Sequence, residues 1–410
     1  MSGWGKTGET GRMFSPHTHS KAARNFMMIR RTRPFSGFRR ALALTTLTAS
    51  LAVALPTPSA WAVHMPKVPE LSASALTPFT QSDKQVWDAV VPLPDGRMLF
   101  EAPAWIGNPG PQLSVRNTDG SFAPYPDADW NAAEGDAAKR IVAAAGVTLL
   151  PDGTLWVLDS GVPNRKAPAV AQPKLIHIDT QKNTVLGTVA IEKTALHPDS
   201  ILSGVAVHEN TAYVTDSGVA GVLVVDIPSA STRRFLDRHP SLTATRPIQI
   251  PGGTLNWGDG RAAAIDSSMI AVSPDGRWIV MQAPGNYLSR VETSTFSDPD
   301  ITPAAMEEIV TQWYKTPSLG GMTIGPDGTL YWSDVSTNSI LSYSTGRIPR
   351  RLITDPRLNF PGTPGLDAHG HLFVPAMQLN HAAAFQNGKA TVTWPVTVYQ
   401  LTLPTTPPPT

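Results

Sequence analysis

Two short segments of this sequence place an aspartate before a serine and a glycine, directly after a run of apolar residues. Asp159 follows Leu155–Leu158, and Asp216 follows Ala212–Thr215. Two carboxylates held at one edge of a β structure could bind a cation or transfer a proton. An aspartate at the end of a strand also accepts hydrogen bonds from nearby backbone N–H groups. Because the motif occurs twice, we favour this structural role for both residues.

Two histidines are further candidates for chemistry. His369 and His371 stand at i and i+2, so on a strand their side chains would point to the same face and could ligate a metal. His369, however, occupies the position that an aspartate fills in the repeated Pro-Asp-Gly turns, so we expect a solvated turn residue. Ser160 lacks the preceding Gly-x of a nucleophile elbow, and the chain has no phosphate loop or dinucleotide fingerprint.

The composition excludes other classes of chemistry. The 410 residues include no cysteine, which rules out a thiol nucleophile, a thiolate metal site and a disulfide. Residues 1–62 hold nine of the 33 Lys and Arg residues and one of the 32 acidic residues, which leaves 24 basic and 31 acidic residues in the rest. This mildly acidic body argues against nucleic acid as a partner, because binding phosphates requires a basic surface.

The N-terminal segment has the three parts of an export signal. A basic region ends at Arg39-Arg40, an uncharged run extends from Ala41 to Leu55, and Ala60-Trp61-Ala62 offers small residues for cleavage. We expect residues 1–62 to be removed, which makes the mature protein secreted or periplasmic. The run is shorter than the ~20 residues that span a bilayer, so no stable membrane span is expected after cleavage. The Arg39-Arg40 pair also suggests twin-arginine export.

The body of the chain repeats a tight turn followed by a strand of aromatic and β-branched residues. Most of these turns are preceded by a short apolar strand, so each closes a β-hairpin. The six turns begin at Pro94, Pro151, Glu209, Pro274, Pro326 and His369. Further strands at residues 174–179 and 222–226 follow two of the hairpins. We therefore predict an all-β fold, a six-bladed β-propeller with four antiparallel strands per blade, over residues 63–403.

Little helix is expected. Residues 303–313 could form one short helix with Pro303 in its first turn. Residues 404–410 are rich in Pro and Thr and cannot form a core, so we expect a disordered tail.

Several segments match a known family, and they do so in order along residues 85–401. The most specific is the segment from Leu155 to Gly161, Leu-Trp-Val-Leu-Asp-Ser-Gly. The others are residues 95–97, 102–105, 119–131, 212–218, 270–276, 355–361 and 378–380. Together they resemble the royal-jelly/yellow family, which includes proteins related to dopachrome conversion, in a bacterial-type form. The resemblance implies a six-bladed propeller and secretion. A more distant similarity links the chain to the gluconolactonase/regucalcin propellers, which hold a divalent metal in the central channel.

At three positions the chain departs from the family pattern. Ser203-Gly204, Ser268-Met269 and Gly320-Gly321 stand where relatives usually carry pairs of Asn or Asp with Asp or Gly. These positions start inner strands, so in a propeller they face the channel, where a hard cation would require several oxygen ligands. We therefore expect no cofactor, and a divalent metal in the channel is disfavoured.

The resemblance also implies residues of a ligand site. In amine-binding members, a Thr and an Asn of one blade contact the ligand, and the matching residues are Thr323 and Asn338. Asp334 is close in sequence and could pair with an ammonium group. Asn380 and His381 lie where relatives also place polar residues. Ordinary turn and strand chemistry is the competing explanation for these residues.

Three functions are compatible with this sequence. The first is a secreted propeller that binds a small molecule, such as an aromatic amine or a related cation, in its central channel. The second is an enzyme, either of dopachrome tautomerase type, which needs a positioned acid or base, or a lactonase-like hydrolase, which needs a channel metal. The third is a protein-interaction scaffold. We favour the first because the body is acidic and because Thr323 and Asn338 match the amine-binding members.

Overall fold

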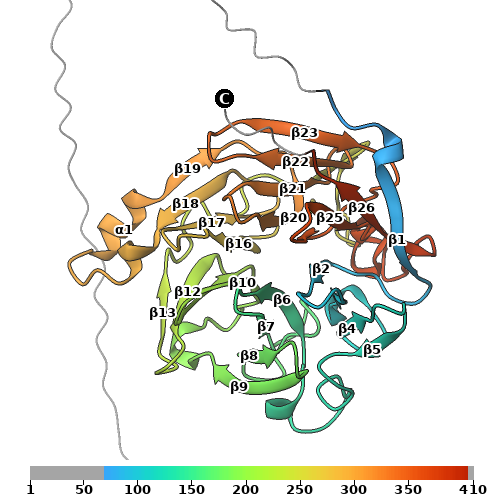
Figure 1. The fold of residues 1–410 in the computed structure, drawn as a ribbon. Helices are drawn as coiled ribbons and strands as arrows, with labels where there is room; N and C mark the ends of the chain where they lie inside the picture. The colour runs from blue at the N-terminus through green and yellow to red at the C-terminus, as the bar shows by residue number, and fades with distance from the viewer. Residues whose placement is uncertain (1–68, 405–410) are drawn as a thin grey trace, which may run out of the picture. The chain divides into compact units, whose positions relative to one another are not determined.

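The computed structural model describes residues 69–404, which form six four-stranded antiparallel sheets around a central axis (Figure 1). The expected export signal in residues 1–62 and the expected tail from residue 405 onward lie outside the described residues. Each sheet is one blade and runs from an inner strand at the axis to an outer strand at the rim. The predicted six-bladed β-propeller with four antiparallel strands per blade is therefore confirmed.

The six blades follow the order of the chain, and each is given from its inner to its outer strand. Blade 1 is β2 (Ala89–Pro92), β3 (Met98–Glu101), β4 (Leu113–Arg116) and β5 (Phe122–Pro124); blade 2 is β6 (Ala144–Leu149), β7 (Thr154–Asp159), β8 (Lys174–Asp179) and β9 (Thr184–Ala190); blade 3 is β10 (Leu202–His208), β11 (Thr211–Asp216), β12 (Gly221–Asp226) and β13 (Thr232–Phe235). Blade 4 is β16 (Met269–Val272), β17 (Trp278–Gln282), β18 (Leu288–Glu292) and β19 (Thr311–Tyr314); blade 5 is β20 (Leu319–Ile324), β21 (Leu330–Asp334), β22 (Ser339–Tyr343) and β23 (Pro349–Thr354); blade 6 is β24 (Gly365–Leu366), β25 (His371–Pro375), β26 (Val396–Thr402) and β1 (Leu76–Ser82).

The remaining elements are short. Besides the hairpin of β14 (Gln249–Ile250) and β15 (Gly253–Thr254), they are the helix α1 (Pro303–Ile309) and the 3₁₀ turns η1 (Ala73–Ala75), η2 (Ala104–Ile106), η3 (Ala137–Lys139), η4 (Lys193–Ala195), η5 (Thr293–Phe296), η6 (Leu379–His381) and η7 (Ala383–Phe385). Within the described part of the chain, no helix combines the length and the apolar character that crossing a membrane requires.

The hairpins between inner and second strands form because an aspartate in the turn binds the backbone that follows it. In blade 2, Asp152 Oδ1 accepts a hydrogen bond from the N–H of Thr154 (2.8 Å). Gly153, between them, has a φ of 82°, a conformation that costs glycine little. The same contact recurs at Asp327 in blade 5. These turns fix the antiparallel register that the sequence predicted.

The ring closes by pairing the first strand of the described chain with the last. β1 joins blade 6 as its outer strand, and Leu76 lies opposite Leu401 of β26. Figure 1 shows this contact between the two ends of the chain. Leu76 and Leu401 are both buried, at 2% and 0% exposure, so the closing strand contributes to the core. Closure also leaves no open sheet edge between the first and last blades.

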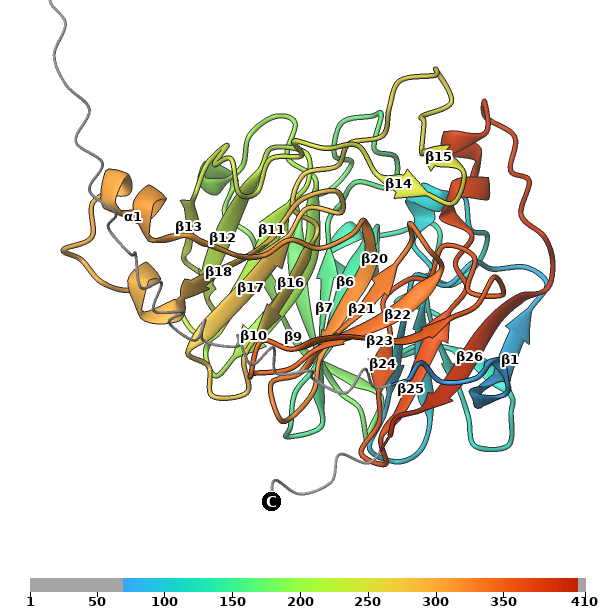
Figure 2. The ribbon, with the colours of Figure 1, turned by 90° about the horizontal axis from the view of Figure 1, so that it is seen from above.

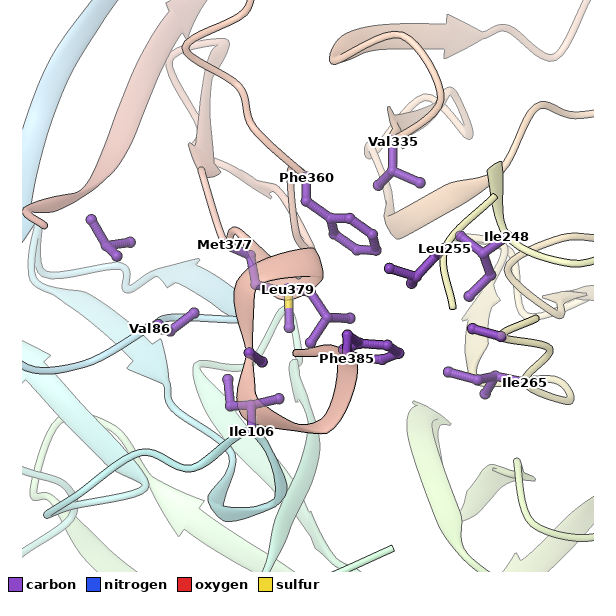
Figure 3. Close-up of a cluster of buried hydrophobic side chains, with 13 residues drawn as sticks. Val86, Ile106, Ile248, Leu255, Ile265, Val335, Phe360, Met377, Leu379 and Phe385 are labelled. Carbon is purple, nitrogen blue, oxygen red and sulfur yellow. The ribbon is translucent and has the colours of Figure 1, made fainter. Parts of the chain in front are cut away.

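An apolar cap covers one face of the propeller. It consists of a cluster of buried side chains from β14–β15, η6, η7 and nearby loops, namely Ile248, Leu255, Ile265, Phe360, Met377, Leu379 and Phe385 (Figure 3). Figure 2 shows that β14 and β15 lie on one face of the ring, outside the blades. These segments are insertions between blades or within blade 6, so they add residues to one end of the channel only.

The helix differs from the expectation in length. It was expected over residues 303–313, but α1 ends at Ile309, and residues Thr311–Tyr314 form β19 instead. Thr302 caps the helix by accepting a hydrogen bond from the N–H of Ala305 (3.1 Å). The following Thr-Gln-Trp-Tyr segment pairs with β18 as the fourth strand of blade 4, because aromatic and β-branched residues fit a strand better than a helix.

Candidate functional site

The central channel contains a cavity of about 120 Å³ at the end where the inner strands begin. Its wall includes Ser203, Ser268, Met269 and Gly320, at or beside the first residues of β10, β16 and β20. These are the positions at which the sequence departs from the family pattern. The apolar cap covers this end of the channel, because Ile248, Ile265, Phe360, Met377 and Leu379 of the cap also line the cavity (Figure 3).

The second strand of each blade ends near this cavity, and in four blades its last residue is acidic. These residues are Glu101 of β3, Asp159 of β7, Asp216 of β11 and Asp334 of β21. A residue that recurs at one position of a repeated unit usually has a structural role. A carboxylate in such a role should be bound by backbone N–H groups or a cation of its own blade.

In blade 2, the carboxylate of Asp159 is 0% exposed and fully satisfied by the protein. It accepts hydrogen bonds from the N–H groups of Val142 (2.9 Å) and Ala143 (2.8 Å), which precede the inner strand, and it pairs with the ammonium group of Lys174. The carboxylate therefore joins the inner, second and third strands of its blade.

Blade 3 repeats this arrangement, whereas the acidic residue of blade 5 accepts its hydrogen bonds from its own turn. Asp216, also 0% exposed, accepts hydrogen bonds from the N–H of Ile201 (2.9 Å) and from Nη1 of Arg234 (3.0 Å). Asp334 is 0% exposed and accepts hydrogen bonds from the N–H of Ser336 (2.8 Å) and other groups of its own turn. The structural role that we favoured for Asp159 and Asp216 is confirmed by these contacts.

Glu101 occupies the same position in blade 1 but lacks such partners. Its side chain is 3% exposed, and its Oε1 atom has no hydrogen-bond partner among the described residues. Asp88 lies beside it, just before the inner strand β2, and the N–H of Asp88 donates to the carbonyl oxygen of Glu101 (2.9 Å). Asp88 also lines the cavity. In this blade a second carboxyl group therefore stands where the other blades provide N–H donors or a cation.

Both carboxyl groups hold protons to unusually high pH. Burial raises the pKa of Asp88 to about 7. Burial and the neighbouring charge of Asp88 raise the pKa of Glu101 to about 8, against the effect of a hydrogen bond from the backbone of Gly146. At neutral pH the pair retains a proton, and Asp88 can take up or release one at the cavity wall. Such a group is suited to acid–base chemistry or to pairing with a cation.

The cavity wall also contains a cation. Arg165, in the loop between β7 and β8, places its guanidinium carbon 5.6 Å from the centre of the Trp105 ring, and its Nη2 donates to Ser217 Oγ (3.0 Å). Burial lowers the pKa of Arg165 to about 10, although the charges of Asp216 and Asp266 oppose this shift. Arg165 remains protonated at neutral pH. The cavity thus combines a fixed positive charge with a negative charge that depends on pH.

Thr323 lies at the other end of the channel from this cavity. It lines a wider opening of about 500 Å³ that is formed by all six inner strands. In the pairing of β20 with β21, Leu319 is opposite Asp334, whereas Thr323 is opposite Tyr331. Four residues of a strand span roughly 13 Å. Thr323 is therefore separated from Asp334, although the two are close in sequence.

The other residues predicted for a ligand site surround the cavity without lining it. Asn338 has a φ of 52° and accepts, through Oδ1, a hydrogen bond from the N–H of Phe360 (3.4 Å), which is a cavity residue. Asn380 and His381 belong to η6 in the apolar cap. The Oδ1 atom of Asn380 is buried without a partner, whereas His381 Nδ1 is 2.9 Å from Thr391 Oγ1. That these residues contact a ligand stays a prediction.

The sequence did not point to Asp88, Glu101 or Arg165. One signal was available for Glu101, because it ends its hairpin strand at the place where Asp159 and Asp216 end theirs. Asp88 and Arg165 lie in connections between strands and match no motif. Their presence at the cavity follows only from the register of β2 with β3 and from the path of the loop after β7.

Among residues 69–404, no three side chains of His, Asp or Glu are close enough together to hold a metal ion. Asp88 supplies one carboxyl group to the cavity wall, and the neighbouring channel positions carry Ser203, Ser268 and Gly320. We therefore derive no metal-dependent step from this site.

Comparisons with known proteins find similar solved structures and one sequence family. No curated protein sequence matches the chain significantly. A gluconolactonase from Xanthomonas campestris matches 82% of this chain and 94% of its own, with 11% identity and a TM-score of 0.47. A virginiamycin B lyase from Staphylococcus aureus matches 80% of this chain and 98% of its own, with 16% identity and a TM-score of 0.42.

The family comparison is more specific. The sequence model of the major royal jelly proteins matches residues 151–279, which extend from the first hairpin turn of blade 2 into the second strand of blade 4. This segment includes Asp159 and Asp216 with their Asp-Ser-Gly motifs. The predicted resemblance to the royal-jelly/yellow family is therefore confirmed, and residues 151–279 carry the signature of the major royal jelly protein family.

Proposed function

We propose that this protein binds a small aromatic amine in the cavity at the start of the inner strands. The proposal rests on the pair of Asp88 and Glu101. In blades 2 and 3 the equivalent carboxylate is bound by N–H groups and a cation, whereas in blade 1 Asp88 lies beside it and can change its charge near neutral pH. A protonated amine beside Asp88 would stabilise the ionised carboxylate and form a charge-assisted hydrogen bond.

The rest of the cavity suits an aromatic ring. Trp105 and Phe360 contribute aromatic surface, and the apolar cap excludes water on one side. The volume of about 120 Å³ is comparable to that of the ~150 Å³ engineered cavities that hold a benzene ring. One ring with a short amine side chain matches this space, and a larger ligand would require the cap to move.

Calorimetric titration with phenethylamine and dopamine tests this proposal. Affinity should rise between about pH 6 and pH 8, as Asp88 becomes ionised. Asp88→Asn should weaken binding about tenfold or more at pH 8, since the charge-assisted contact is lost. Asp129→Asn, at an exposed residue in the connection between β5 and β6, serves as the matched control and should change nothing. Equal affinity in wild type and Asp88→Asn would contradict the proposal.

A tautomerase-type enzyme is the second candidate, and one observation favours it. The pKa of Asp88, about 7, is suited to removing a proton from one atom of a bound substrate and returning it to another. This reaction consumes no co-reactant, since the proton is only moved. Loss of dopachrome absorbance beyond the uncatalysed rate would support it. Turnover that persists in Asp88→Asn would exclude Asp88 as the acid or base. The lactonase-like and scaffold alternatives gain no support from the contacts at the cavity.

We also propose that the protein is exported and that residues 1–62 are the signal. Support comes from the arginine-rich region, the uncharged run and the small residues before Val63. Expression of the full chain in a bacterial host followed by N-terminal sequencing of the exported fraction tests this. Val63 as the first residue is expected, and an intact N-terminus on protein retained in the cytoplasm would contradict it. Replacing both Arg39 and Arg40 by Lys separates twin-arginine export, which should stop, from general secretion, which should continue.

A further inference from the structure

A second cavity, of about 410 Å³, lies between blades 4 and 5 and has no lining residue in common with the central cavity. Its floor and rim are formed by the two Pro-Asp-Gly turns that contain Asp275 and Asp327. Its wall is formed by one face of blade 4 and includes Trp278, Arg290 and Trp313. This size falls within the range of roughly 300–1,000 Å³ that is usual for ligand pockets.

The three wall residues come from three neighbouring strands and share one face because of the strand register. Arg290 of β18 lies opposite Val280 of β17 and Thr311 of β19. Trp278 and Trp313 are each two residues away from these partners, so alternation along a strand turns all three side chains to the same side. The face they share is the one directed toward blade 5.

The guanidinium group of Arg290 is stacked between the two indoles. Its central carbon lies 4.2 Å from the centre of the Trp278 ring and 4.7 Å from the centre of the Trp313 ring. Such cation–π contacts hold the flat group in place and cover its two faces. Only its N–H edges are left for hydrogen bonds, and a guanidinium edge matches a carboxylate through two parallel bonds.

Arg290 has no ion-pair partner among residues 69–404. No acidic side chain forms an ion pair with it, whereas its neighbour Arg277 pairs with Glu292 (2.7 Å). The Nε atom of Arg290 and the Nε1 atom of Trp313 are both buried without a hydrogen-bond partner. Burial and the nearby charges of Arg347 and Arg277 lower the pKa of Arg290. A half-buried cation without an ion-pair partner in a cavity wall favours an anionic ligand.

We propose that this cavity is a second ligand site, for a small organic monocarboxylate with a ring or other apolar body. Arg290 binds the carboxylate through the exposed part of its guanidinium group. The apolar body packs against Val280, Ile324 and Leu330, which also line the cavity. Asp275 and Asp327 at the rim repel further negative charge, which disfavours phosphates and dicarboxylates. This proposal is independent of the amine site at Asp88.

Saturation-transfer NMR and calorimetry with indole-3-acetate and benzoate test the proposal, with benzamide and inorganic phosphate as comparators. Saturable binding of the carboxylates is expected, with benzamide and phosphate about tenfold weaker or undetectable. Arg290→Gln should weaken carboxylate binding by about tenfold or more. Arg290→Lys keeps the positive charge but loses the two parallel N–H donors of the guanidinium group, so it should weaken binding less. Arg261→Gln, at an exposed arginine that pairs only with Asp259, is the matched control and should have no effect.

The central cavity contains another arginine, so the two sites must be distinguished. Arg165→Gln should leave carboxylate binding unchanged if Arg290 holds the ligand, and loss of binding in Arg165→Gln but not in Arg290→Gln would overturn the proposal. Absence of saturable carboxylate binding up to about 10 mM would also overturn it. Circular dichroism melting shows whether Arg290→Gln is folded, and Trp313→Leu provides an independent variant that should weaken binding without removing a charge.

Discussion

The N–H of Asp88 donates a hydrogen bond to the carbonyl oxygen of Glu101 (2.9 Å), so the buried Glu101 lies beside a residue that lines the central cavity. In blades 2 and 3 the equivalent carboxylate is paired with Lys174 or Arg234 and stabilises its own blade. Blade 1 is the exception in this comparison. Because its two carboxyl groups disfavour each other's ionisation, this blade gives up stability that the other two retain.

The first prediction concerns the pH dependence of stability. Carboxyl groups titrate near pH 4 in an unfolded chain, but the pKa values of Asp88 and Glu101 are about 7 and about 8 in the folded protein. Between these limits the folded state binds protons that the unfolded state has lost. The contribution of the pair to stability is therefore complete below about pH 4 and falls as the pH rises to about 8.

Glu101→Gln should reduce the fall in stability that the wild type shows as the pH rises from about 4 to about 8. Urea unfolding should show the variant to be more stable than the wild type near pH 8.5 and close to it near pH 4, since glutamine cannot ionise. Glu134→Gln, at an exposed residue, should follow the wild-type profile. Parallel profiles for the wild type and Glu101→Gln would show that Glu101 is not protonated at neutral pH.

The second prediction concerns the structural carboxylates. Asp216→Asn should destabilise the protein by about 3 kcal/mol, because it removes the buried one of the two carboxylates that pair with the guanidinium of Arg234 and leaves only the more exposed Asp237. Asp226→Asn, at an exposed residue that ends the next strand, should cost less than about 1 kcal/mol. Thermal and urea unfolding measure both. A cost for Asp216→Asn no larger than that for Asp226→Asn would contradict a structural role.

The third prediction concerns the departure from the family pattern at Ser203-Gly204. Gly204 has a φ of 78°, and a Cβ atom there would lie 2.6 Å from the carbonyl oxygen of Ser268 in the next blade. Gly204→Ala should therefore destabilise the protein by about 1–3 kcal/mol and disturb the cavity wall. Gly187→Ala, on β9, meets no atom within 4 Å and should be neutral or slightly stabilising. Similar unfolding midpoints for the two variants would contradict this account.

The fourth prediction distinguishes the two ends of the channel. If the amine binds in the capped cavity, Thr323→Ala should leave its affinity within about twofold of the wild type, because Thr323 lines the opposite opening. Asn338→Ala should weaken binding modestly through the Phe360 segment that it supports. A calorimetric titration measures both. A large loss in Thr323→Ala alone would place the ligand in the wide opening instead.

The fold was largely predictable because each blade repeats one local signal. An aspartate and a glycine in four of the six turns, followed by aromatic and β-branched residues, specify a hairpin independently of the rest of the chain. The helix was predicted too long, because the apolar and polar residues of Thr311–Tyr314 fit either element and only pairing with β18 decides between them. Tertiary pairing of this kind is not encoded in a local window.

The site was less predictable for the same reason. Asp88 and Glu101 are 13 positions apart in sequence, and their contact depends on the register of one hairpin. Thr323 and Asn338 are 15 positions apart, yet the intervening strand takes them to opposite ends of the channel. Arg165 reaches the cavity from a loop whose path no sequence pattern specifies. A repeated motif was easy to recognise, whereas the blade that breaks the repeat was not.

Proton release on amine binding tests the central claim most directly. Phenethylamine keeps its own proton at pH 7, so any proton released must come from the protein, and titrations in two buffers with different heats of ionisation measure it. We predict release of a substantial fraction of one proton in the wild type and none in Asp88→Asn, because the bound cation ionises the Asp88 carboxyl. Binding without proton release, or equal release in Asp88→Asn, would contradict the assignment of this pair as the amine site.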